Sequence, residues 1–120
     1  MRILIVESDP GLGFIWQNHM MRQGHDVVLA EDQHQASKAL DEAQFDVILL
    51  DIVLARGSAL AVADLATQSH PDIRIIFVTS TSFFSDGSIF NLTPNARAFL
   101  QADTPPEDLT AVIEHYGKAS

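Results

Sequence analysis

The chain alternates short, continuously apolar runs with longer stretches in which apolar residues recur every three or four positions. Five runs have the length of a buried strand, and they cover residues 3–6, 27–30, 47–50, 73–78 and 96–100. A continuous apolar run, as opposed to an alternating one, is typical of a parallel strand that is covered on both faces. The pattern therefore predicts an α/β fold, a doubly wound five-stranded parallel sheet with helices on both sides.

Most of the stretches between these runs have helical signatures. The first two place their predicted buried stripes at Leu12, Ile15, Trp16, His19 and Met20, and at Ala36, Ala39, Leu40 and Ala43. Residues 58–68 are rich in alanine and predict a third helix with Ser58 as its N-cap. Residues 81–96 contain glycine, asparagine and proline without sustained periodicity, which predicts a short or distorted fourth helix.

The last helix has the most complete start signal. Thr104 precedes two prolines and Glu107, which matches a capping box with Thr104 as the N-cap. The apolar stripe of this helix follows at Leu109, Val112, Ile113 and Tyr116. No linker, repeat or low-complexity stretch interrupts the pattern, so we expect residues 1–120 to form a single domain without an output domain.

Composition narrows the class of protein. A chain of 120 residues with 47% hydrophobic residues can bury one core. The absence of cysteine excludes disulfides and thiol chemistry, and it favours a cytoplasmic location. No apolar run approaches the roughly 18 residues of a membrane helix, so we expect no membrane segment. The formal net charge of −9 repels phosphate backbones, so we expect no nucleic-acid partner.

Acidic residues follow two of the predicted strands. Glu7 and Asp9 come after the first strand, and Asp51 comes after the third. Ligands of open parallel sheets bind beyond the carboxyl ends of the strands, and in the order 2-1-3-4-5 these two strands are neighbours. Converging carboxylates suit Mg²⁺, and one of them can serve as a nucleophile for a phosphoryl group. Thr79 ends the fourth strand and brings a hydroxyl to the same edge.

Each of these residues also has an ordinary structural role. An aspartate after a strand is often a turn former, and Asp9 before Pro10 reads most simply as an N-cap. A nucleotide-binding reading rests on Gly11 and Gly13, which match the first two positions of G-x-G-x-x-G. Trp16 occupies the third glycine position, and the nearby acids would face the pyrophosphate. We therefore disfavour nucleotide binding.

Four segments resemble the response-regulator receiver (CheY-like) domain, in register over essentially the whole chain: "ILIVES", "DVILLDIVL", "IIFVTS" and "NARAFL". The resemblance implies the flavodoxin-like (βα)5 fold. It also implies that Asp51 accepts a phosphoryl group from a partner histidine and that Thr79 and Phe99 form a switch pair. The implied Mg²⁺ ligands are Glu7, Asp51 and the main-chain carbonyl of Val53.

The same resemblance implies the partners. These are a histidine kinase or phosphotransfer protein and a downstream protein that contacts the face of the fourth helix, fifth strand and fifth helix. Phe83 and Phe84 lie near that face and are candidate contacts, and a homodimer is a further expectation. The domain would be no enzyme beyond its own phosphorylation and dephosphorylation.

Three departures weaken the expected chemistry. Ser8 stands where the family has a second acid, which leaves Ser8 or Asp9 as substitute metal ligands and lowers the expected Mg²⁺ affinity. Ala102 stands where the family has a lysine, and losing that charge-assisted hydrogen bond would weaken the phosphorylated state by about 10- to 100-fold. In the loop after Asp51, Ala55 and Arg56 replace the common Pro-Gly. Arg56 or Arg97 is a candidate replacement for the lysine.

These residues are compatible with two functions. The first is a stand-alone receiver in a two-component phosphorelay, which accepts phosphate on Asp51 with weakened Mg²⁺-dependent chemistry. The second is a pseudo-receiver, a protein-binding module that works independently of phosphorylation. Asp51 and Thr79 favour the first function, whereas Ser8 and Ala102 favour the second.

Overall fold

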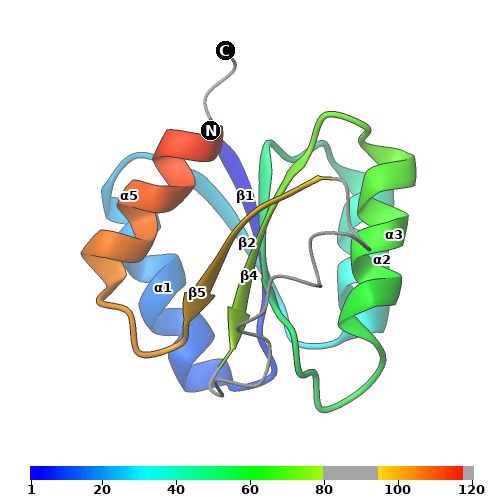
Figure 1. Ribbon diagram of the computed structural model, residues 1–120, viewed down its shortest axis with the longest axis horizontal. Coiled ribbons are helices and arrows are strands. Elements are labelled where there is room, and N and C mark those ends of the chain that lie inside the picture. The colour runs from blue at the N-terminus through cyan, green and yellow to red at the C-terminus, as the bar shows by residue number, and fades with distance from the viewer. Residues whose placement is uncertain (80–94, 118–120) are drawn as a thin grey trace.

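The computed structural model describes residues 1–79 and 95–117. The short or distorted helix predicted over 81–96 falls almost entirely outside these residues, as do Phe83 and Phe84. The described part contains one sheet with helices on both faces (Figure 1). None of its helices is long and apolar enough to cross a membrane.

The sheet has five parallel strands in the order β2-β1-β3-β4-β5, as predicted. Their bounds are Arg2–Val6 (β1), Asp26–Ala30 (β2), Val47–Asp51 (β3), Arg74–Thr79 (β4) and Ala96–Gln101 (β5). In the central pairs, Val6 lies opposite Leu50 and Asp51 lies opposite Val78. The chain therefore leaves β1 and β3 at the same level of the same edge.

Helices α1 (Pro10–Arg22) and α5 (Pro106–Gly117) cover one face of the sheet, and α2 (Gln33–Glu42) and α3 (Ala59–Ser69) cover the other (Figure 1). Alternate residues of β3 enter the two cores: Ile48 packs with α2 and α3, and Leu49 packs with α1 and α5. Both residues are fully buried. This two-sided burial explains why the central strands β1, β3 and β4 are continuously apolar, whereas the edge strands β2 and β5 are only partly buried.

Two helix starts match the sequence patterns. The Ser58 hydroxyl accepts a hydrogen bond from the Ala61 amide at 3.3 Å, so Ser58 is the N-cap of α3. Asp9 is the N-cap of α1, because its Oδ1 accepts from the amides of Gly11 at 3.0 Å and Leu12 at 3.3 Å. Each side chain thus satisfies amides that have no partner within the helix.

The predicted buried stripe of α1 is wrong at Ile15, whose side chain is 54% exposed. The buried residues of this helix are Gly13, Trp16 and Met20. Gly13 lies so close to β2 that a Cβ there would stand 2.8 Å from Leu29 Cδ1. This close approach turns the Gly13 side of the helix to the sheet and leaves Ile15 facing outward.

The predicted capping box of the last helix is also wrong. Helix α5 begins at Pro106, two residues after Thr104. The Thr104 hydroxyl donates to the Gln101 carbonyl at 2.6 Å and is directed back toward β5. Pro105 holds the capping position by its backbone, since its carbonyl accepts from the amides of Asp108 and Leu109, both at 3.0 Å.

Candidate functional site

Two carboxyl groups meet at the edge of the sheet where β1 and β3 end. Asp51 is the last residue of β3, and Glu7 directly follows β1 at the corresponding register position. Glu7 is almost completely buried, with 3% of the residue exposed, whereas Asp51 is partly exposed. The predicted convergence of these acids is therefore present in the fold, with the inner acid shielded from water and the outer one accessible.

The Glu7 carboxyl has a strongly altered acidity. Burial raises its pKa to about 8, with a further contribution from Asp51, to which a protonated Glu7 can donate a hydrogen bond. Its Oε1 accepts a hydrogen bond from the Asp9 amide at 3.1 Å. Its Oε2 is buried and accepts none from the described residues. The pair therefore holds a proton near neutral pH when no cation is bound.

This arrangement fits a magnesium ion. Glu7 and Asp51 supply two carboxylates, and Mg²⁺ typically needs only one or two because it retains several waters. Within residues 1–79 and 95–117 no group of three or more His, Cys, Asp or Glu side chains is placed to hold a metal. The buried Oε2 of Glu7, without a donor in that part of the chain, is an oxygen that a cation would satisfy.

The loop after β3 is oriented by Asp51 itself. Asp51 Oδ1 accepts a hydrogen bond from the Val53 amide at 3.0 Å, which forms a tight turn directly after the strand. The side chain of Val53 is 58% exposed at the rim of the site. Val53 is thus next to Asp51, as its expected role as a carbonyl ligand requires.

The two residues weighed as substitute ligands have other partners. Asp9 caps α1 through Oδ1, as described above. The Ser8 hydroxyl donates to the Glu31 carbonyl at 3.1 Å and accepts from the Ala55 amide at 2.8 Å. The Ser8 side chain therefore links three loops, a role for which its sequence pattern contained no signal because the partners are main-chain groups 23 and 47 residues away.

Thr79 and Phe99 lie on the neighbouring strands β4 and β5. Thr79 is fully buried and pairs with Gln101, while Phe99 pairs with Phe77. The rings of Phe77 and Phe99 have centroids 6.3 Å apart and are tilted by 38°. Because residues two apart on a strand face the same side, Thr79 and Phe99 lie on the side of the sheet that α2 and α3 cover.

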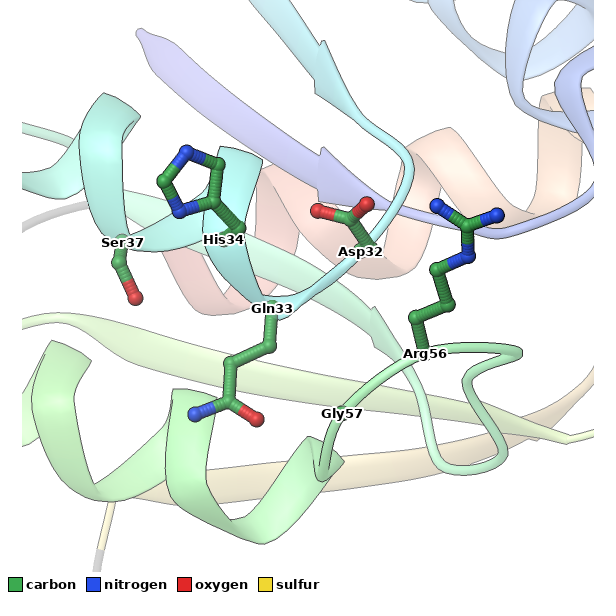
Figure 2. Close-up of a pocket in the computed structure, with 6 residues that line it drawn as sticks. All are labelled: Asp32, Gln33, His34, Ser37, Arg56 and Gly57. Carbon is green, nitrogen blue, oxygen red and sulfur yellow. The ribbon is translucent and has the colours of Figure 1, made fainter.

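Ala102 occupies the position at which the resemblance implies a lysine, and Arg56 and Arg97 are the candidate replacements for that lysine. Ala102 is anchored beside Thr79, since its amide donates to the Thr79 carbonyl at 2.7 Å. Arg56 borders a cavity of about 580 Å³ whose other lining residues are Asp32, Gln33, His34, Ser37 and Gly57 (Figure 2), and it also lines a second cavity with Ser8 and Glu31. Arg97 lies near the start of β5, at the opposite edge of the sheet from Asp51.

Comparison with known proteins agrees with this geometry. The family model of the response regulator receiver domain matches residues 3–114. The response regulator receiver protein CpdR of Brucella abortus is 30% identical over 78 residues, which are 65% of each chain. The chain spans 36%, 65% and 47% of the length of three curated relatives that it matches, so some of those proteins are much longer.

Solved structures share the fold. A CheY-like receiver domain protein from Methanospirillum hungatei has a TM-score of 0.86 at 24% identity, over 97% of this chain and 92% of that one. The response regulator TrrA of Thermotoga maritima, solved with Mg²⁺ and BeF, has a TM-score of 0.81 at 24% identity, over 96% and 97% of the two chains. With a family match over nearly all of its length and the acidic pair at the ends of β1 and β3, this chain belongs to the response regulator receiver domains of two-component signalling.

Proposed function

We propose that this domain acts as a receiver that accepts a phosphoryl group on Asp51. The donor would be a phosphohistidine of a histidine kinase or phosphotransfer protein. The observation that carries the proposal is the pairing of a buried Glu7 with an accessible Asp51 at the carboxyl ends of neighbouring strands. Receiver domains are regulatory phosphoacceptor domains. The resemblance implies that Asp51, the last residue of β3, is the acceptor.

The transfer would be a displacement at phosphorus. A carboxylate oxygen of Asp51 forms the new P–O bond while the P–N bond to the histidine breaks, and the electron pair of that bond returns to the imidazole nitrogen. The Val53 amide holds Oδ1 of Asp51 in a fixed direction, which reduces the cost of orienting the nucleophile. The Thr79 hydroxyl, at the end of the adjacent strand β4, is the proposed donor to a phosphoryl oxygen.

The residues proposed to hold Mg²⁺ are Glu7, Asp51 and the main-chain carbonyl of Val53. A bound Mg²⁺ would neutralise charge on the incoming phosphoryl group. We expect its affinity to be weak, because Ser8 contributes no carboxylate and its hydroxyl is bonded to Glu31 and Ala55. Glu7 must lose its proton before its carboxylate can bind a metal. Mg²⁺ should therefore bind more tightly as the pH rises toward 8, the raised pKa of Glu7.

Incubation with acetyl phosphate and Mg²⁺, followed by intact mass measurement, tests the proposal. We expect slow or partial addition of one phosphoryl group, which Asp51→Asn abolishes. Asp41→Asn, a substitution of an exposed aspartate in α2, is the matched control and should leave labelling unchanged. If a receiver with the full set of family residues is labelled under the same conditions and this chain is not, the phosphoacceptor function is wrong.

The second candidate is a binding module that needs no phosphate. It is favoured by one specific observation: Ala102 occupies the position at which the resemblance implies a lysine, so this position supplies no ammonium group. Absence of labelling would support it. Under either function, the proposed location is the cytoplasm and the proposed contact surface for a downstream protein or a second copy includes β5 and α5.

A further inference from the structure

The loop between β3 and α3, residues 52–58, is held by hydrogen bonds at two points to the stretch that runs from the end of β2 into the start of α2. The first is the Ser8 hydroxyl. It donates to the carbonyl of Glu31, which follows β2, and accepts from the amide of Ala55 in the loop, at 3.1 Å and 2.8 Å. One side chain at the end of β1 therefore connects the three loops that follow β1, β2 and β3.

The second point is Gln33 at the start of α2. Its Oε1 accepts a hydrogen bond from the Ser58 amide at 2.8 Å, and its own amide donates to the Arg56 carbonyl at 3.4 Å. Figure 2 shows the Gln33 side chain directed at the loop around Gly57. Gly57 has φ of +91°, and a Cβ there would lie 2.4 Å from Gln33 Cβ. The loop and α2 are thus in close contact at this point.

The Ser8 contacts need a group that donates and accepts at once. A hydroxyl does both, whereas a carboxylate at position 8 accepts only and would face the Glu31 carbonyl with like partial charges. Alanine would leave the Ala55 amide and the Glu31 carbonyl without this partner. Threonine retains the hydroxyl. The residue that departs from the family pattern is therefore chemically suited to its two main-chain contacts.

We propose that Ser8 is a positioning residue that locks the β3–α3 loop, together with Gln33, so that the loop beside Asp51 is held without metal or phosphate. The proposal rests on the proposed function only in assigning Glu7, Asp51 and Val53 to the metal site. At position 8 the chain therefore has a serine that fixes the loop, where the resemblance implies an acid that binds the metal. Restoring the acid should strengthen Mg²⁺ binding and loosen the loop.

Hydrogen exchange at the Ala55 amide, followed by NMR without Mg²⁺ or a phosphoryl donor, tests the lock. Ser8→Ala should speed this exchange by about 5- to 10-fold, since it removes the acceptor. Ser8→Thr should remain within about twofold of the unchanged protein. Ser69→Ala, at an exposed serine at the far end of α3, is the control and should have no effect. The Leu49 amide, in the central strand, reports global opening.

The proposal is overturned if Ser8→Ala leaves the hydrogen-exchange rate of the Ala55 amide unchanged. It is also overturned if the Leu49 amide is accelerated equally, because that result would mean general destabilisation. Ser8→Asp adds a second measurement. We expect this variant to bind Mg²⁺ more tightly in a titration, while hydrogen exchange at the Ala55 amide becomes faster. An unchanged Mg²⁺ affinity would contradict the proposal that Ser8 replaces a metal ligand. None of these measurements requires phosphorylation, so failure of labelling at Asp51 and failure of the lock remain distinguishable.

Discussion

Glu7 has an environment that differs sharply from that of an ordinary glutamate in water. Its carboxyl is buried beside Asp51, and its pKa is raised to about 8 from 4.5. A single proton on Glu7 removes the repulsion between the two acids, as a cation would. The same residue therefore connects the stability of the fold to the chemistry of the site.

This raised pKa predicts a pH-dependent stability. Between pH 4.5 and 8 the folded protein retains a proton on Glu7 that the unfolded chain releases, so the free energy of unfolding should fall as pH rises. The slope from this group is at most about 1.4 kcal/mol per pH unit. Urea unfolding of the unchanged protein and of Glu7→Gln at about pH 5 and about pH 8 measures it.

The stability of Glu7→Gln should change less over this pH range than that of the unchanged protein, because glutamine does not titrate. Added Mg²⁺ should stabilise the unchanged protein at the higher pH and have little effect on the variant, which lacks the carboxylate. Parallel pH profiles for the two proteins would mean that Glu7 ionises normally in the folded state.

Ala102 gives the second prediction at this scale. Ala102→Lys introduces an ammonium group at the position where the resemblance implies a lysine, directly after β5, where the Ala102 amide donates to the Thr79 carbonyl. A charge-assisted hydrogen bond to the phosphoryl group should favour the phosphorylated state by about 10- to 100-fold. The measurement is the labelled fraction with acetyl phosphate at steady state. Ala111→Lys, at an exposed site in α5, adds the same charge and should not change that fraction.

At the scale of elements, the main feature is the contact between α2 and the loop that precedes α3. Gly57 has positive φ and no room for a Cβ against Gln33. Gly24 has nearly the same φ, +92° against +91°, but a Cβ there would meet nothing within 4 Å. The two glycines therefore share one backbone requirement and differ in packing, which makes them a natural matched pair.

Replacing each of these glycines by alanine separates the two effects. Gly24→Ala should destabilise the protein by about 1 kcal/mol through backbone strain alone. Gly57→Ala should cost about 1–3 kcal/mol more, because the added methyl group would displace the loop or Gln33. Urea unfolding measures both costs. Equal costs would show that the loop accommodates the methyl group without resistance.

At the scale of the whole molecule, the crossover order places β1 beside β3 and so unites residues that are 44 positions apart in the chain, Glu7 and Asp51. Continuous apolar runs predicted this sheet well, because the central strands β1, β3 and β4 are buried on both faces and so carry apolar residues at successive positions. Helix packing was predicted less well. Ile15 faces outward because Gly13 lets α1 approach β2 closely, a contact between elements that periodicity within one helix does not contain.

The sequence was sufficient to predict the architecture and the identity of the acids at the end of the sheet, because strand period, strand length and the position of an acid after a strand are local properties of the chain. It was not sufficient to predict the state of those acids. The raised pKa of Glu7 depends on burial and on Asp51, and the role of Ser8 depends on Glu31 and Ala55. Desolvation and hydrogen bonding between distant segments arise only when the chain is folded. The sequence therefore identified these residues, whereas the pKa of Glu7 and the hydrogen bonds of Ser8 were decided by the tertiary structure.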